Sequence, residues 1–184
     1  MLWRQARIRA HGTLSSWGRR EDGVTALEFA MVAPWFLMLL FGIMAVGLFF
    51  FTTFTLENAV EQAARLIRTG QAQAAGMTAE QFKSKVCENA PQYVDCTSKM
   101  RVSVVSGADP GTLTTPSCVD AGGALAPPAS SAYTPGGSGV YVLVTVCYEW
   151  ELAGNIPFLH LGDMGNGSAL IQATTAFKTE PYGS

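Results

Sequence analysis

Charged side chains are scarce in this sequence, and their scarcity excludes an ordinary soluble domain. They make up 14% of the 184 residues, whereas soluble domains average roughly 25%. No charge lies between Glu28 and Glu57, and as a helix those 28 residues would be about 42 Å long, against roughly 30 Å for a hydrocarbon core. The run is too long for the apolar part of a signal peptide, and no small-x-small cleavage site follows it. We therefore expect a membrane-spanning helix.

Residues typical of catalytic and metal sites are also few. The two histidines, His11 and His160, occupy the N-terminal tail and a late loop, so they predict neither a triad nor a metal cluster. Cys-x-x-Cys pairs, phosphate loops and nucleophile elbows are absent from the sequence. Glu149 and Glu151 fall on one face of a predicted strand, which we interpret as a solvated face and not as a catalytic pair. We therefore expect no enzymatic activity, no metal ion and no cofactor.

Charge is distributed unevenly along the chain. Residues 1–23 carry five arginines and two acidic residues, and residues 24–184 carry seven basic and twelve acidic residues. Because all five arginines precede the apolar run, the positive-inside rule predicts a cytoplasmic N-terminus and an exported remainder, in the periplasm or an equivalent space. The arginines form no recognisable reading motif, so we expect no nucleic-acid partner.

The four cysteines, Cys87, Cys96, Cys118 and Cys147, all follow the apolar run. An even number in the exported part predicts two disulfides in an oxidising compartment, with four buried free thiols as the alternative. Four cysteines allow three connectivities. We favour Cys87–Cys96, which closes a short loop around Pro91. We also favour Cys118–Cys147, because Cys147 points away from the apolar face of its strand, toward the side over which a long loop can fold.

The apolar run continues into an amphipathic helix. Beyond the membrane segment, apolar residues recur at helical spacing, at Leu56, Val60, Ala63 and Ile67. We expect the helix to begin near Thr25 and to end at Gly70 or Gly76. A kink is expected at Pro34, which leaves the carbonyl of Ala30 without its helical partner. The narrow stripe is not stable in water alone, so it predicts a covering sheet or helix.

A second, short helix and three strands should follow. Thr78 opens a capping box for a helix that ends near Asn89. We predict strands over residues 100–106, 139–152 and 169–178. The second should be central, with its apolar face from Val140 to Trp150 against the long helix, because it is the longest and is apolar on both faces. Residues 107–138, rich in Gly, Pro and Ser, predict a long surface loop.

The junction between the basic leader and the apolar run resembles a known signature. Gly23-Val24-Thr25-Ala26-Leu27-Glu28-Phe29 resembles the processing site of class III prepilins. The longer stretch GVTALEFAMVAPWFLMLLFGI resembles the TadE-like minor pseudopilins of the tight-adherence (Flp, type IVc) pilus apparatus. The resemblance covers about residues 20 to 65, with a weaker likeness in the closing TTAFKTEPYG.

This resemblance implies a processing site and a set of partners. Gly23 would be the last leader residue and Val24 the mature N-terminus, after a cut by a membrane-embedded prepilin peptidase on the cytoplasmic side. Phe29 stands where major Flp pilins usually have Tyr, and it is common in the TadE-like branch. The implied partners are the membrane, the peptidase, other pilins and pseudopilins and the pilus assembly platform. The implied role is pilus biogenesis and surface adherence from the bacterial inner membrane, with incorporation into an extracellular pilus as a further option.

Glu28, the fifth residue of the implied mature chain, has two interpretations. A carboxylate at membrane depth costs on the order of 2.5–3.5 kcal/mol if it is central, and less near the interface. A subunit one step along a filament could place the new α-amine of Val24 beside Glu28, and this pairing would fix the axial register. In the alternative, Glu28 only snorkels to the cytoplasmic headgroups. The resemblance favours the assembly role.

The expected organisation has three parts. These are a cytoplasmic basic leader at residues 1–23, a transmembrane helix at 24–55 and a periplasmic domain at 56–184 that includes the loop 107–138. The expected fold class is α+β and pilin-like, with the long helix packed on a small antiparallel sheet. The functional alternative is an uncleaved single-pass anchor that carries a periplasmic binding domain, with the loop as its contact surface. Processing separates the two, because an anchor would keep residues 1–23.

Overall fold

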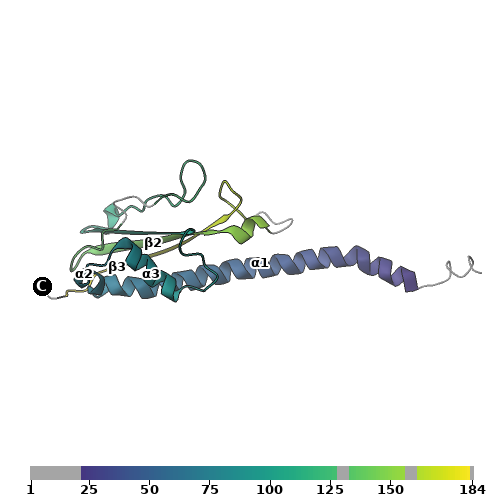
Figure 1. The fold of residues 1–184 in the computed structure, drawn as a ribbon, viewed down its shortest axis with the longest axis horizontal. Helices are drawn as coiled ribbons and strands as arrows, with labels where there is room; N and C mark the ends of the chain where they lie inside the picture. The colour runs from purple at the N-terminus through teal and green to yellow at the C-terminus, as the bar shows by residue number, and fades with distance from the viewer. Residues whose placement is uncertain (1–21, 128–132, 156–160, 183–184) are drawn as a thin grey trace, which may run out of the picture. The chain divides into compact units, whose positions relative to one another are not determined.

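The computed structural model describes residues 22–127, 133–155 and 161–182. Its helices are α1 (Asp22–Arg68), α2 (Gln71–Ala74), α3 (Ala79–Asn89) and the 3-10 turns η2 (Pro110–Thr112) and η3 (Glu151–Asn155); its strands are β1 (Met100–Gly107), β2 (Tyr141–Trp150) and β3 (Ala169–Lys178) (Figure 1). The fold is α+β, a long apolar helix followed by a small antiparallel sheet, as predicted. The chain divides into two compact units, Met1–Phe41 and Gly42–Ser184. We call the second unit the head.

The described part of the first unit belongs entirely to α1. Leu, Met and Ala, which are common there, have high helix propensity, and none of them competes for backbone hydrogen bonds. Most of its side chains are exposed, and Phe29 and Trp35 are 73% and 74% accessible. The helix is long and apolar enough to cross a membrane. Exposed aromatic and aliphatic side chains at this density require a cover of lipid or protein.

The sheet of the head has the strand order β1-β2-β3, and both pairings are antiparallel. β2 is central, as its length and its apolar residues on both faces predicted. Val146 faces Val102 on one side and Ala173 on the other, so alternate β2 residues share one face with apolar partners on both neighbours.

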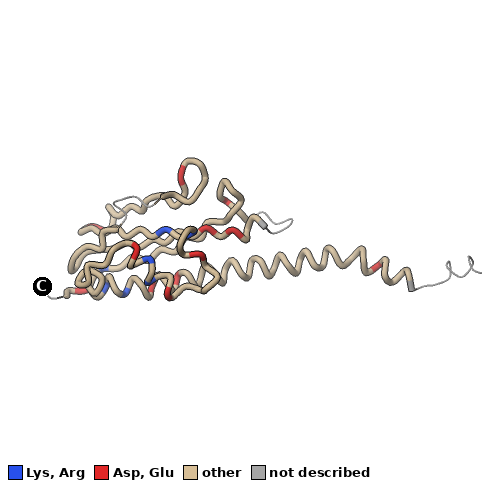
Figure 2. The backbone as a smooth tube through the Cα atoms, viewed as in Figure 1, with Lys and Arg blue, Asp and Glu red and all other residues tan. Residues whose placement is uncertain are grey.

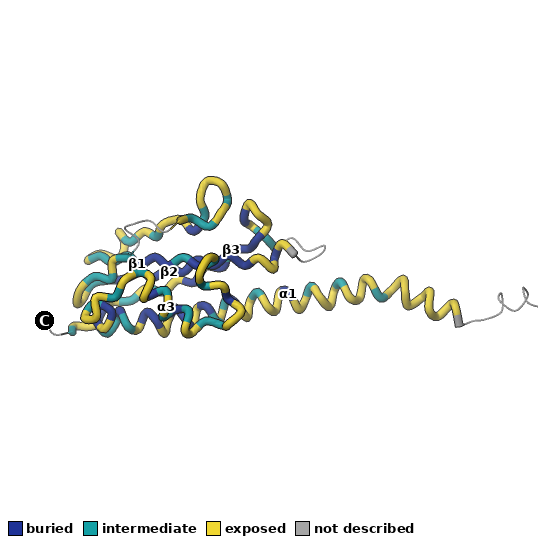
Figure 3. The backbone as a smooth tube through the Cα atoms, viewed as in Figure 1, coloured by how far each residue is buried: buried dark blue, intermediate teal, exposed yellow. Residues whose placement is uncertain are grey.

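The head part of α1 covers this apolar face and forms one core with it (Figure 3). The predicted helix stripe Leu56, Val60, Ala63 and Ile67 is at most 1% exposed. On β2, Val142, Val144 and Val146 are fully buried. At one end of the contact, the rings of Phe49 and Trp150 meet edge to face with centroids 5.4 Å apart. The structure therefore confirms the predicted packing of the stripe on the sheet.

The segment after α1 adds a second helix to the core. Gly70 ends α1 with φ 79°, and a Cβ there would lie 2.5 Å from the ring of Tyr182, so only glycine fits both the turn and the packing. Thr78 then accepts a hydrogen bond from the Gln81 N–H while the Gln81 side chain accepts one from the Thr78 N–H, which completes the predicted capping box. Phe82 of α3 is fully buried in the same core.

The chain between β1 and β2 is mostly exposed over its described residues and is tied to the sheet at two points. Cys118 is bonded to Cys147 on the sheet face that lies opposite α1. Further on, the Thr134 N–H donates to the Val104 carbonyl at 2.8 Å, and Tyr133 forms a parallel bridge with Val104. This return segment therefore lies along the outer edge of β1. Residues 128–132 of the predicted loop lie outside the described residues.

One expectation about the sheet was wrong. Glu149 is 8% exposed and not solvated. Its Oε1 accepts hydrogen bonds from Asn166 Nδ2 at 2.5 Å and from Ser168 Oγ at 3.0 Å, both from the turn that precedes β3. Glu151 does not share its strand face, because β2 ends at Trp150 and Glu151 begins η3. The turn supplies the polar partners that allow a carboxylate to be buried.

Candidate functional site

The residues of the predicted processing site occupy the first turns of α1. A Cβ added at Gly23 would meet nothing within 4 Å, so the backbone there is open to approach by another protein. Val24 and Phe29 are 56% and 73% exposed. Val24 precedes Glu28 by four residues, which places the two side chains on the same face of the helix.

Glu28 has no hydrogen bond or ion pair within the residues that the structure describes. Its side chain is exposed. No charged residue follows it until Glu57, and Figure 2 draws this length of α1 in tan. A carboxylate in such a helix is unfavourable in lipid unless it finds a partner or reaches the headgroups. The position of Glu28 is therefore compatible with both interpretations drawn from the sequence, a charged partner or the headgroups.

Pro34 lies inside α1, and the helix continues past it to Arg68. Proline has no N–H, so the carbonyl of Ala30 lacks its usual helical donor at this point. In a membrane, a neighbouring helix can satisfy such a carbonyl. The kink proposed from the sequence stays a prediction.

The head contains a hollow of about 400 Å³ between α1, the segment before β1 and the end of β2. Its walls include Leu48, Thr52, Tyr93, Lys99 and Trp150. Thr52 Oγ1 and Tyr93 Oη lie 3.3 Å apart and link α1 to the segment before β1. Thr52 also donates to the Leu48 carbonyl at 2.8 Å, so this hydroxyl is engaged on both sides.

Lys99 lies beside two of the carboxylates around the hollow. Lys99 forms an ion pair with Glu151, and its Nζ lies 3.9 Å from Glu149. The hydrogen bond from Lys99 to Glu151 is the main cause that raises the pKa of the Lys99 ammonium. Hydrogen bonds from the Ser98 side chain and backbone lower the pKa of the Asp95 carboxyl, and burial raises the pKa of Tyr148. These groups form a structural network and present no nucleophile with an adjacent base.

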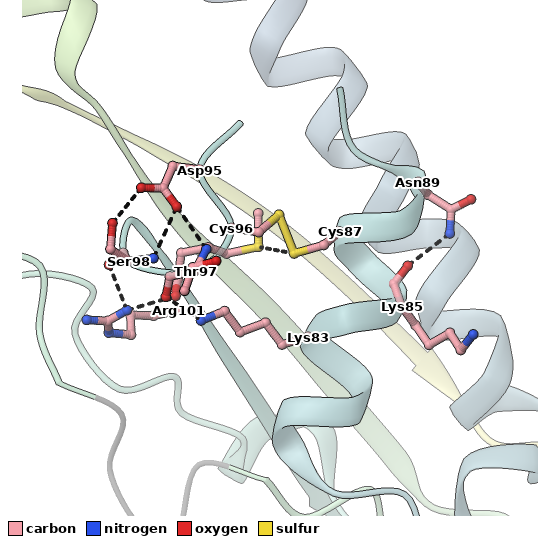
Figure 4. Close-up of a disulfide and its surroundings, with 10 residues drawn as sticks. Lys83, Lys85, Cys87, Asn89, Asp95, Cys96, Thr97, Ser98 and Arg101 are labelled. Atoms are coloured by element: carbon pink, nitrogen blue, oxygen red, sulfur yellow. Dashed lines mark hydrogen bonds between the residues drawn. A yellow bond between two sulfur atoms is a disulfide. The ribbon is translucent and has the colours of Figure 1, made fainter. Parts of the chain in front are cut away.

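The two disulfides join the cysteine pairs that the sequence favoured. Cys87 of α3 is bonded to Cys96, with Cα atoms 6.0 Å apart, and Cys118 is bonded to Cys147, with Cα atoms 5.7 Å apart. The segment after Cys96 is ordered by Asp95, which accepts hydrogen bonds from the Thr97 and Ser98 N–H groups and from Ser98 Oγ (Figure 4). The described residues contain no free cysteine.

No group of three or more His, Cys, Asp or Glu side chains that could hold a metal ion occurs in the described ranges. His11 and His160 lie outside them. Sequence reasoning missed the network of Lys99, Glu149 and Asn166, because its members come from three segments far apart in the chain. The available signal was an acidic residue in a largely apolar strand, with Asn166 and Ser168 in the turn before the next strand.

Comparison with known proteins gives one finding. Residues 23–65 match the family model described as TadE-like protein, in agreement with the resemblance seen in the sequence. The matched segment is the part of α1 that carries Gly23, Val24, Glu28, Phe29 and Pro34, together with the first three-quarters of the stripe that packs on the sheet. Comparison with curated proteins and with solved structures gave no match.

Proposed function

We propose that this chain, a TadE-like protein of the tight-adherence pilus system over residues 23–65, is a minor pseudopilin. In this proposal a prepilin peptidase removes residues 1–23, α1 anchors the chain in the inner membrane, and the head lies in the periplasm. The protein then takes part in assembling an Flp-type pilus together with other pilins and the assembly platform. Its role is structural and not enzymatic.

One observation carries the proposal. A single helix has the open backbone of Gly23 in its first turn and carries Glu28, which has no partner among the described residues. The helix stays apolar and mostly exposed as far as Phe41 and further on forms one wall of the head core. A helix that only anchors a binding domain needs neither the open glycine nor the carboxylate. A pseudopilin uses both, the first for cleavage and the second for pairing with the new α-amine of a neighbour.

Processing is tested by the intact mass and N-terminal sequence of protein extracted from its native membrane. We expect the wild-type protein to begin at Val24. Gly23→Leu should remain at full length, because a branched side chain would block approach to the scissile peptide. Ala26→Leu, on the mature side of the cut, is the control and should be processed. A wild-type protein that begins at Met1 would favour the uncleaved anchor.

The assembly role of Glu28 is tested separately from processing. Glu28→Val and Glu28→Gln should insert normally, since either change makes the helix more apolar. We expect both to lower the number of pili per cell by electron microscopy, because the α-amine of the neighbouring subunit loses its counter-charge. Glu57→Gln, an exposed carboxylate on the same helix within the head, is the matched control. Normal piliation in the Glu28→Val strain would return Glu28 to a snorkelling role.

A further inference from the structure

The exposed side of α1 within the head changes from apolar to polar in less than one helical turn. Phe50, Phe51 and Phe54 are each more than half exposed. The exposed positions that follow are all polar, namely Glu57, Asn58, Glu61, Gln62 and Arg65. Apolar side chains at this density need a cover, whereas the polar ones suit water. When α1 is inserted in a membrane, the boundary with water on this side of the helix therefore lies just after Phe54.

The hollow in the head lies at the level of this boundary. Two of its lining residues, Leu48 and Thr52, belong to α1. They precede Phe54 by six and two residues, which is about 9 and 3 Å along the helix axis. The headgroup layer on each side of a bilayer is roughly 5–8 Å thick. With α1 inserted, the hollow therefore spans the headgroups and the upper ends of the acyl chains.

The lining of the hollow contains a buried donor without an acceptor. Trp150 is 2% exposed, and its indole N–H has no hydrogen-bond partner among the described residues. A buried N–H is rarely left unpaired in a native protein, and an indole can only donate. Leu48 and Leu152, which also line the hollow, are about half exposed. A fitting ligand therefore combines an acceptor oxygen with an apolar chain.

The charges around the hollow select the kind of headgroup. Its lining holds one ammonium, that of Lys99, and three carboxylates, those of Asp95, Glu149 and Glu151. Lys99 lies beside Glu149 and Glu151, and Asp95 has no ion pair among the described residues. Hydrogen bonds from the Ser98 side chain and backbone lower the pKa of the exposed Asp95 carboxyl, so it is ionised at neutral pH. This excess of negative charge repels an anionic headgroup and attracts a cationic one.

We propose that the hollow binds one phospholipid of the surrounding membrane whose headgroup ends in an ammonium group, as in phosphatidylethanolamine. The ammonium pairs with Asp95, and an ester or phosphate oxygen accepts a hydrogen bond from the Trp150 N–H. An acyl chain lies along Leu48 and Leu152. The volume of about 400 Å³ is that of a small-ligand site, so the hollow takes the headgroup and ester groups and leaves most of the chains in the bilayer. The proposal rests on the insertion of α1 in the membrane, which is one part of the proposed function.

A lipid suits this hollow better than a segment of another protein does. The apolar run of α1 continues into the head without a charge until Glu57, so the lipid around the helix reaches the hollow without a partner chain. Tyr93 and Trp150, which both line the hollow, are the two aromatic types enriched where a bilayer meets water. The Tyr93 hydroxyl lies 3.3 Å from Thr52 Oγ1, which holds the ring at this level of α1. A lipid bound here would fix the depth of the head at the membrane surface.

Tryptophan quenching of the full chain in vesicles tests the proposal. Trp3, Trp17 and Trp35 are replaced by phenylalanine, which leaves Trp150 as the remaining tryptophan. The protein is reconstituted in vesicles of equal parts phosphatidylethanolamine and phosphatidylglycerol with identical acyl chains. In each of two preparations, one of the lipids carries bromine atoms on its chains close to the ester groups. We expect brominated phosphatidylethanolamine to quench Trp150 several-fold more strongly than brominated phosphatidylglycerol.

The other outcomes of this experiment each overturn the proposal. Equal quenching by the two brominated lipids would mean that Trp150 meets only bulk bilayer. Stronger quenching by brominated phosphatidylglycerol would mean that the hollow prefers an anionic headgroup. No quenching by either lipid would mean that water or a segment of another protein fills the hollow.

Asp95→Asn in the same preparation isolates the charge. Asparagine can still accept the hydrogen bonds from the Thr97 and Ser98 N–H groups, which both go to one Asp95 oxygen. We expect the preference for brominated phosphatidylethanolamine to be lost, because the ammonium loses its counter-charge. Asp109→Asn is the matched control, since Asp109 also accepts a backbone hydrogen bond, from Gly111, and does not line the hollow. A preference that survives in Asp95→Asn, or is lost in Asp109→Asn, would contradict the pairing of the ammonium with Asp95.

Trp150→Phe isolates the hydrogen-bond donor. Phenylalanine keeps an aromatic ring against Phe49 and removes the N–H, so the head should keep both disulfides and its circular dichroism spectrum. By native mass spectrometry of the detergent-solubilised chain, Trp150→Phe should bind phosphatidylethanolamine several-fold more weakly than the wild type. Trp35→Phe removes an exposed indole N–H outside the head and should bind as the wild type does. Equal affinities of Trp150→Phe and the wild type would contradict the site. The result is separable from the proposed function, because an uncleaved anchor inserts α1 in the same way.

Discussion

At the scale of single residues, Glu149 is the carboxylate whose environment matters most for the head. It is 8% exposed on the sheet face opposite α1, and its Oε1 binds Asn166 and Ser168. These bonds tie the turn before β3 to the central strand. Because β3 starts directly after that turn, Glu149 helps to set where β3 begins.

Glu149→Leu should lower the free energy of unfolding of the head by about 1–3 kcal/mol, since it leaves the buried Ser168 hydroxyl without its acceptor and removes the bond to the exposed Asn166. The change can be measured by urea unfolding of the detergent-solubilised protein, followed by tryptophan fluorescence. Glu88→Gln removes a carboxylate from an exposed ion pair with Lys85 and should change stability by no more than roughly 0.5 kcal/mol. If the two variants change the free energy of unfolding equally, the Glu149 contacts stabilise the head no more than an exposed ion pair does.

At the scale of elements, patterns that repeat along one segment were predictable, and contacts between distant segments were not. The stripe from Leu56 to Ile67 and the alternation around Val144 each define a buried face without knowledge of any partner. Thr134 had no such signal, because its pairing with Val104 depends on how a 30-residue connection folds back. The same reason hid the partners of Glu149, which lie 17 and 19 residues further on.

Val144→Asp should unfold the head, because it places an unpaired charge in a fully buried position between α1 and the sheet. The expected loss is several kcal/mol. Leu113→Asp, on the partly exposed connection after η2, should change stability by about 0.5 kcal/mol or less. Proteolysis of the two variants in membranes measures the difference: the Val144→Asp head should be digested and the Leu113→Asp head should resist. A protease-resistant Val144→Asp head would contradict the packing of α1 on this face.

At the scale of the whole molecule, the two disulfides close loops of different length on different sides of the sheet. Cys87–Cys96 spans 9 residues next to α3, and Cys118–Cys147 spans 29 and ties the long connection to β2. In the chain-entropy model, longer loops gain more stability from closure. The second disulfide should therefore contribute more to the head than the first.

Replacing Cys118 and Cys147 together by alanine should destabilise the head by about 1 kcal/mol more than replacing Cys87 and Cys96 together. Urea unfolding of both double variants under non-reducing conditions measures the difference. Double replacement avoids free thiols and mispaired bonds. A larger loss from the Cys87 and Cys96 pair would mean that packing around α3, and not loop entropy, dominates.

The long contact between the head part of α1 and the sheet also has a mechanical consequence. A tension along the axis of α1 that pulls the helix away from the head loads in shear the contacts that residues 49–68 make with the sheet. The packed side chains then resist the pull together. A force applied across the axis would peel the same contacts apart one after another, at a much lower load. The contact is therefore strongest against a pull along the helix axis.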